Sequence, residues 1–135
     1  MSWGAEQPDA SRPLAEALRL QRKAAKLGFD WPAIEPLWDK LAEEVEELRA
    51  AIAAGQQQDI QDELGDLLFM LVNFARFLDV TPEQALDSVN RKFVRRLRHI
   101  EADLRESGRD WQDASLEEME ALWQASKLKP DDSAR

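Results

Sequence analysis

Two short acidic motifs hold the residues whose types and spacing could do chemistry. The first, EEVEE, covers residues 43–47, and the second, ELGD, covers residues 63–66. Each motif places two acidic residues three positions apart, Glu44 with Glu47 and Glu63 with Asp66, which puts each pair on one face of a helix. Carboxylates beside an apolar core are costly unless a cation neutralises them. Each pair therefore either faces water or binds a cation.

The apolar pattern predicts that both motifs lie on long helices. The helix that holds EEVEE is expected over residues 33–54, ending at Gly55, and the next helix is expected from a capping residue, Asp59, to about Leu78. The apolar stripe of the first of these helices consists of Leu37, Leu41, Val45, Leu48 and Ile52. Because few residues separate the two helices, we expect an antiparallel hairpin.

In such a hairpin the four carboxylates converge. Measured from the stripe residue Leu41, Glu44 and Glu47 are rotated by roughly 60° and 120° to one side. Measured from Ile60, Glu63 and Asp66 are rotated by roughly the same two angles in the same direction. Side chains with matching offsets on antiparallel helices emerge on the same side of the seam, so the sequence predicts one cluster.

A cluster of carboxylates alone indicates a site for a hard divalent cation. Oxygen-only ligands suit Mg²⁺, with Mn²⁺ as the alternative. For either pair taken separately, a solvated helix face is the simpler interpretation. A di-iron bundle would need a Glu-x-x-His pair on each of two helices, whereas the single histidine, His99, is preceded three positions earlier by Arg96.

The rest of the chain predicts three more helices and no strands. The first runs from a Ser11 cap to Gly28, the fourth begins at the capping box TPEQ (81–84) and closes near Gly108, and the fifth begins at the capping box SLEE (115–118). The apolar stripe of the fourth helix consists of Leu86, Val89, Phe93, Leu97, Ile100 and Leu104. The expected fold is an all-α antiparallel bundle of about five helices.

Length and composition narrow the class of protein. The chain has 135 residues, so we expect one helical domain over residues 13–128 between flexible ends at 1–12 and 129–135. A net charge of −9 disfavours general binding to nucleic acid or an anionic membrane. The chain has no cysteine, no apolar run near the roughly 20 residues of a membrane span and no signal-peptide pattern. We therefore expect a cytoplasmic protein.

The ordered motifs resemble the MazG-type all-α nucleoside triphosphate pyrophosphohydrolases. Besides the two acidic motifs, the likeness includes QRKAAKLGFDW (21–31), DELGDLLF (62–69), NRKFVRRLRHIE (90–101) and LWQASK (122–127). In larger members of this family the domain occurs twice, and the likeness here is to the second copy. The resemblance implies Mg²⁺-dependent cleavage of nucleoside triphosphates to the monophosphate and pyrophosphate.

The resemblance also assigns roles by motif position. It implies that Glu44, Glu47, Glu63 and Asp66 are the metal ligands. Some relatives use the first glutamate of E-E-x-x-E to activate water, which makes Glu43 the candidate general base, although a plain surface charge is nearly as good an interpretation.

Candidate substrate contacts lie in the last two predicted helices. Lys92 and Arg96 are spaced as an i, i+4 pair on one flank, suited either to phosphate contact or to ordinary salt bridges. Asn90 falls at the edge of the apolar stripe, where its amide serves either a structural hydrogen bond or ligand orientation. By resemblance, Trp123 and Lys127 would close over the nucleotide. Core packing is the alternative role for Trp123.

The helix over residues 59–78 also predicts association. Its stretch LLFMLVNFARFL (67–78) is apolar nearly all the way round, which fits either the centre of the fold or a subunit interface. The resemblance favours a homodimer or a dimer of dimers. The alternative function is a non-catalytic helical oligomer that binds nucleotide or a protein partner.

Overall fold

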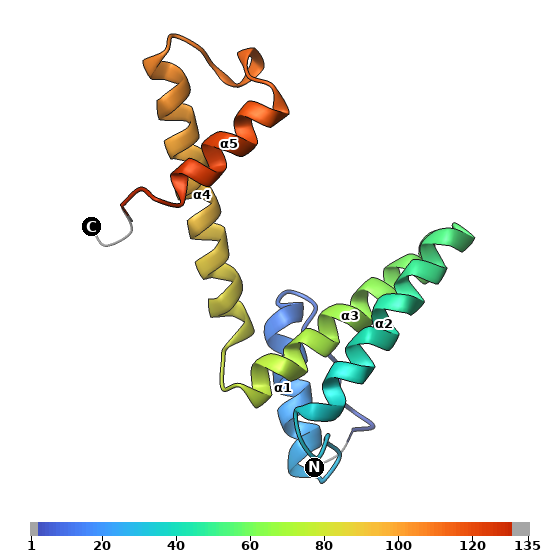
Figure 1. Ribbon diagram of the computed structural model, residues 1–135. Helices are drawn as coiled ribbons and strands as arrows, with labels where there is room; N and C mark the ends of the chain where they lie inside the picture. The colour runs from blue at the N-terminus through green and yellow to red at the C-terminus, as the bar shows by residue number, and fades with distance from the viewer. Residues whose placement is uncertain (1–2, 131–135) are drawn as a thin grey trace. The chain divides into compact units, whose positions relative to one another are not determined.

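The computed structural model describes residues 3–130, and within this range the chain forms helices and no strands (Figure 1). The α-helices are α1 (Pro13–Lys26), α2 (Glu35–Ala54), α3 (Gln57–Phe77), α4 (Pro82–Glu106) and α5 (Leu116–Ser126). A short 3₁₀-helix, η1, covers Trp111–Asp113. The all-α class and the five α-helices were predicted correctly. The chain divides into two compact units, one up to Ala85 and one from Leu86 onward.

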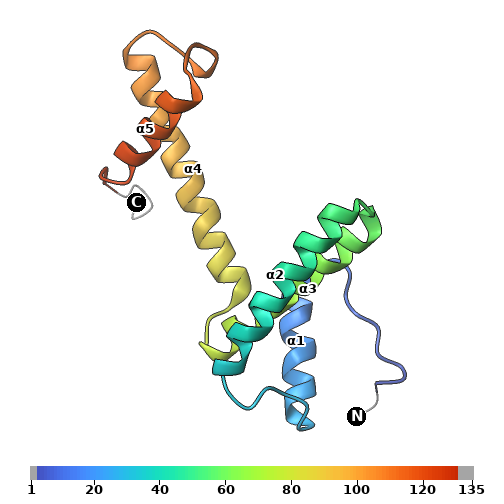
Figure 2. The same ribbon diagram turned by 45° about the vertical axis from the view of Figure 1, so that its right-hand side comes forward.

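The first unit is built on the hairpin of α2 and α3. The two helices run side by side in both ribbon views (Figures 1 and 2), and α1 packs against α3. Gly55 allows the tight reversal because it ends α2 in the left-handed region, with φ 72°, where other residues are strained. The predicted antiparallel hairpin is therefore present, and it brings the two acidic motifs together.

The core of the first unit lies at the open end of this hairpin. Leu37 from α2 and Met70 and Phe74 from α3 are buried against one another, and Trp31 from the loop before α2 packs on them. The Trp38 ring lies 4.7 Å from the Phe74 ring, centroid to centroid. Burial of such side chains stabilises the fold by about 1.5–3 kcal/mol each, so this end of the hairpin is its anchor.

The N-terminal segment is tied to α1 by charge. Glu6 pairs with Arg19 and with Lys23, and the Nε of Arg19 donates to Glu16 over 2.5 Å. The backbone N–H of Asp9 also donates to Glu16, over 2.7 Å. These bonds hold Glu6 and Asp9 against the helix, and the flexibility of residues 1–12 stays a prediction.

The second unit packs α5 back onto the C-terminal half of α4 (Figures 1 and 2). Ile100 and Leu104 are 2 % and 0 % exposed. The indole N–H of Trp111 donates to Glu101, and Arg109 pairs with Glu118. In the other half of α4, by contrast, Leu86, Val89 and Phe93 are about half exposed. In the part of the chain that the structure describes, the first half of the predicted apolar stripe is therefore more exposed than the second half.

Two predicted helix caps are wrong and one is partly right. Ser11 and Asp59 do not cap their helices: α1 begins after Arg12, and the cap position of α3 is Gln56. The Ser11 hydroxyl instead donates to Asp9. Ser115 does cap α5, accepting from the Glu118 N–H, but the Glu118 carboxylate is bound to Arg109. Short polar side chains have several local partners, so the cap that forms depends on the neighbouring fold.

Bilayer crossing requires a long apolar helix, and none of the helices in the described part of the chain has both the length and the apolar character.

The ion pairs of Glu16 predict acid sensitivity. The hydrogen bond from Arg19, followed by that from the Asp9 backbone, lowers the pKa of Glu16 from 4.5 to about 2. This stabilisation is therefore present above the unfolded pKa and is lost as the pH falls from 4.5 toward 2. We expect Glu16→Gln to lower the Tm at pH 7, with the difference from wild type vanishing near pH 2. Thermal unfolding followed by circular dichroism across this pH range checks it.

Glu46→Gln is the matched control, because Glu46 is 72 % exposed and its nitrogen–oxygen distance to Arg49 is 3.8 Å. Its Tm should follow the wild type at every pH. A Tm difference for Glu16→Gln that does not change with pH would contradict the assignment.

Candidate functional site

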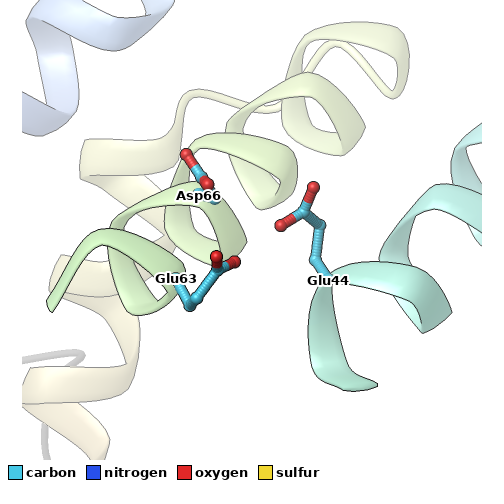
Figure 3. Close-up of side chains that lie close together, drawn as sticks. All are labelled: Glu44, Glu63 and Asp66. Carbon is cyan, nitrogen blue, oxygen red and sulfur yellow. The ribbon is translucent and has the colours of Figure 1, made fainter. Parts of the chain in front are cut away.

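The acidic cluster lies where α2 faces α3. Glu44 comes from α2, and Glu63 and Asp66 come from successive turns of α3, with the three carboxyl groups turned toward a common space (Figure 3). One oxygen of each lies within 4.8 Å of the other two. The convergence predicted from the matching rotational offsets is therefore observed for these three residues.

Burial makes this cluster different from a solvated acidic face. Glu44 is only 6 % exposed, and Glu63 is half-buried. One carboxylate oxygen of each, Oε2, is buried without a hydrogen-bond partner among the described residues. A buried carboxylate oxygen without a partner carries a large desolvation cost, and a cation at this point would remove it.

Glu47 lies beside the group of three rather than within it. Its carboxyl is a hydrogen-bonding neighbour of Glu63, and the pKa of Glu63 is raised by burial first, then by this hydrogen bond and by the charges of Glu47, Asp66 and Glu44. The fourth predicted residue is therefore adjacent to the cluster, in contact with one member.

Lys40 is the cation that the structure places at the edge of the cluster. Its ammonium lies 3.3 Å from Oε1 of Glu44 and 3.2 Å from Oε1 of Glu43, and hydrogen bonds to these two carboxylates raise the pKa of Lys40. Glu43 itself is 55 % exposed at its side chain. The sequence analysis missed Lys40. Its spacing of three and four residues before two glutamates was the available signal.

The donor set fits a divalent cation with oxygen ligands. Mg²⁺–oxygen bonds of about 2.0–2.1 Å place two ligands on one ion at most about 4.2 Å apart. Ligand oxygens that already lie within 4.8 Å of one another need only small side-chain rotations to reach that geometry. The single positive charge of Lys40 cannot neutralise four carboxylates. The Oε2 atoms of Glu44 and Glu63, which have no hydrogen-bond partner among the described residues, are available as ligands for a cation.

The predicted substrate contacts all belong to the second unit. Arg96 and Trp123 meet there, with the guanidinium carbon 5.1 Å from the ring centroid, and the Phe93 ring lies 5.7 Å from the Trp123 ring. Lys92 is half-buried, and Lys127 is exposed. Asn90 is also exposed, so the buried amide expected from the stripe is not found. The structure brings Arg96 and Trp123 together as neighbours.

Comparison with known proteins assigns the family. Residues 33–101 match the family model of the MazG nucleotide pyrophosphohydrolase domain. This stretch is half of the chain and includes both acidic motifs. The chain belongs to the MazG family. The resemblance drawn from the sequence motifs is therefore confirmed.

Curated relatives extend the match beyond this core. The MazG-family chain is 37 % identical over 114 residues to the nucleoside triphosphate pyrophosphohydrolase/pyrophosphatase MazG of Thermotoga maritima. It is 38 % identical over 122 residues to the nucleoside triphosphate pyrophosphohydrolase of Escherichia coli K12. These alignments cover 84 % and 89 % of this chain but 44 % and 46 % of the relatives. An uncharacterized protein of Bacillus subtilis, YabN, is 45 % identical over 74 residues, 55 % of this chain and 15 % of that protein.

The geometry of the cluster predicts that divalent cations stabilise this MazG domain. We expect Mg²⁺ or Mn²⁺ to raise the Tm, because an ion at 100 times its dissociation constant stabilises the folded state by about 2.7 kcal/mol. Glu44→Gln and Glu63→Gln should each abolish most of the shift. Removing one of several repelling charges should also leave the metal-free Glu63→Gln variant at least as stable as wild type. Thermal unfolding with and without metal checks both points.

Glu46→Gln serves again as the control, since this exposed glutamate lies in the same motif but outside the cluster. It should keep the wild-type response to metal. Equal shifts in Glu46→Gln and Glu44→Gln would show general ionic stabilisation and would contradict a specific site.

Proposed function

We propose that this chain hydrolyses nucleoside triphosphates to the nucleoside monophosphate and pyrophosphate with the help of Mg²⁺, Mn²⁺ being the alternative ion. The observation that carries the proposal is the cluster of Glu44, Glu63 and Asp66 in a domain of the MazG family, in which Glu44 is buried and one oxygen each of Glu44 and Glu63 has no hydrogen-bond partner among the described residues. The chain spans less than half the length of the first two relatives above. The activity in the names of these relatives therefore supports the proposal for this chain and does not replace a test.

The carboxylates would hold the ion and orient water. Glu44, Glu47, Glu63 and Asp66 are the proposed ligands, with Glu47 joining through its contact with Glu63. When bound, the ion neutralises phosphate oxygens and lowers the barrier to attack by water. Water adds to the α-phosphorus, the bond from that phosphorus to the α–β bridging oxygen breaks, and this oxygen leaves with pyrophosphate.

Glu43 is the proposed acceptor of the proton that the water loses. It is exposed and paired with Lys40 at the rim of the cluster, so its carboxylate is open to solvent and can accept a proton from a water molecule beside the cluster. Lys40 would hold the orientation of Glu43 and Glu44 through its two contacts.

Cations and an aromatic ring of the second unit complete the proposal. Lys92 and Arg96 would bind the triphosphate, because paired cations stabilise the charge that develops on departing pyrophosphate. Trp123 and Lys127 would contact the nucleotide, and Asn90 would orient it. Residues 13–128 would act as one catalytic domain. A cytoplasmic role in removing non-standard or excess nucleotides goes with this activity, since the substrate pool lies there.

Isotope labelling tests the site of cleavage. We expect incubation with a nucleoside triphosphate and Mg²⁺ in H₂¹⁸O to place the label in the monophosphate and to release pyrophosphate without orthophosphate as a primary product. Glu44→Gln should lower kcat by about 100-fold or more, as loss of a residue that positions charge in the reaction typically does. Glu46→Gln is the control and should retain activity. Mass spectrometry of both products gives the result.

Label in orthophosphate would mean attack at the γ-phosphorus and would contradict the proposed reaction. Absence of turnover with every triphosphate, with nucleotide binding intact, would favour the non-catalytic oligomer.

We also propose a homodimer, or a dimer of dimers, formed through the apolar face of α3. Leu64, Leu68 and Leu71 follow one another at helical spacing and are 47 %, 52 % and 47 % exposed. A contiguous exposed stripe of this kind is typical of an association surface. A second copy of the same stripe would cover it.

Leu68→Glu tests the dimer. A charge buried at an apolar interface is strongly disfavoured, so we expect the mass measured by light scattering to fall from that of an oligomer to that of one chain. Leu116→Glu, at an exposed position of α5 (70 % exposed), is the control and should leave the mass unchanged. A single-chain mass for the wild type would rule out the proposed assembly.

A further inference from the structure

The first unit contains a cavity that is separate from the acidic cluster. It has a volume of about 730 Å³ and lies between α1, the loop that follows it, and α3. Four aromatic side chains form much of its wall: Trp3, Phe29, Trp31 and Phe69. Sites for small organic molecules have this size and this apolar lining, with a few polar groups that fix the orientation of the ligand.

The polar end of the cavity is a hydrogen-bonded network centred on Arg76. Its Nη1 and Nη2 donate to the two carboxylate oxygens of Asp30 over 2.9 and 2.7 Å. Its Nε donates to Oε1 of Gln21 over 3.3 Å, and Nη2 also donates to Oδ1 of Asn73 over 2.8 Å. Gln21 and Asn73 are each 6 % exposed. Four side chains from three segments are thus fixed before any ligand is present.

Asn73 is the member of this network with a donor to spare. Because a guanidinium only donates, the atom of Asn73 that faces Arg76 must be its oxygen, which directs the NH₂ group elsewhere. Among the described residues, the hydrogen-bond contact of this NH₂ group is the sulfur of Met70, at 3.9 Å. A thioether is a weak acceptor, so a buried amide donor remains under-used next to an aromatic-walled cavity.

The cavity and the acidic cluster lie on the same face of α3. Asp66, Phe69, Asn73 and Arg76 follow one another at spacings of three and four residues, which is one stripe of a helix. Asp66 belongs to the cluster, and the other three line the cavity. Asn73 is two turns beyond Asp66, about 10 Å along the axis. That separation suits a nucleotide whose phosphates are at the cluster and whose base is in the cavity.

We infer that this cavity takes the base of the substrate nucleotide and favours bases that present a carbonyl oxygen to the Asn73 amide. The inference rests on the proposed function and adds a base-recognition residue to it. A base is planar and apolar on its faces, which suits the aromatic walls. A keto oxygen accepts from the Asn73 NH₂ group, whereas an exocyclic amino group at the same ring position would meet it donor to donor. Trp123, from the second unit, would be a separate contact.

The N-terminal segment contributes to this cavity through Trp3. The Lys23 ammonium lies 4.4 Å from the centroid of the Trp3 ring, and the same lysine pairs with Glu6. Trp3 is 43 % exposed, so the core of the unit does not depend on it. Its removal therefore probes the cavity wall without emptying the core.

The test uses two nucleotides whose bases differ at the ring edge that faces Asn73: one presents a keto oxygen beside a ring N–H, and the other presents an amino group beside an unprotonated ring nitrogen. Inosine and adenosine 5′-monophosphates carry a keto and an amino group at the same ring position, and neither has an anhydride to cleave. Calorimetric binding to the full chain should favour the inosine nucleotide by about tenfold, the value of one buried hydrogen bond. Asn73→Asp keeps an oxygen toward Arg76 but replaces the donor by an acceptor, so the preference should reverse. With triphosphates, kcat/KM should change in the same order.

Two variants complete the design. Trp3→Ala should weaken binding of both monophosphates severalfold without changing their ratio. Gln112→Glu, the same amide-to-carboxylate change at an exposed position in η1, should change neither. An unchanged keto-to-amino ratio in folded Asn73→Asp, or wild-type binding in Trp3→Ala, would overturn the inference.

The two proposals fail separately. Triphosphate cleavage with no effect of Asn73→Asp on the ratio leaves the proposed function standing and overturns the base site. Monophosphate discrimination that reverses in Asn73→Asp, with no cleavage of any triphosphate, supports the base site and overturns the hydrolase.

Discussion

Repulsion among carboxylates is the constraint around which the first unit is organised. One carboxylate oxygen each of Glu44, Glu63 and Asp66 lies within 4.8 Å of the other two, with Glu47 alongside. Asp66 is exposed, but Glu44 is only 6 % exposed and cannot turn to water. Packing of Leu37, Met70 and Phe74 at one end of the α2–α3 hairpin and the left-handed turn at Gly55 at the other hold the helices together against this repulsion. The free energy of the core therefore supports a group of carboxylates that is unfavourable by itself, as is common at functional sites.

One helix, α3, combines most of the proposed functions. Its first turns carry Glu63 and Asp66, its middle carries the apolar stripe from Leu64 to Leu71, and its last turns carry Asn73 and Arg76. Asp66, Asn73 and Arg76 share one face of the helix, and Leu64, Leu68 and Leu71 lie on the opposite face, where they are about half exposed. When most faces of a helix make contacts, few of its positions tolerate substitution, because each change affects packing or one of the proposed metal and ligand contacts.

The sequence predicted the acidic cluster because helical geometry is local. Residue spacing determines which side chains share a face of a helix, and a short connection makes two helices antiparallel. The proximity of Glu44, Glu63 and Asp66 could therefore be predicted from the sequence. The caps at Ser11 and Asp59 were wrong because a short polar side chain chooses between several near-equal local partners. The network of Arg76 with Asp30 and Gln21 joins residues 46 and 55 positions apart, and no periodic pattern announces such a contact. Asn73 was hidden for the same reason inside an apolar run.

The guanidinium of Arg76 has one further consequence. Four of its hydrogen bonds are already made, to Asp30, Gln21 and Asn73, and they join the loop after α1 to the end of α3. A lysine could not replace it, since a single ammonium cannot span three partners in one plane. These hydrogen bonds of the guanidinium order the loop before any ligand binds. A molecule that enters the cavity therefore loses its own conformational freedom, but binding carries no further entropy cost for ordering the loop. Recognition there is rigid, and discrimination between similar rings rests on shape and on the direction of a single amide.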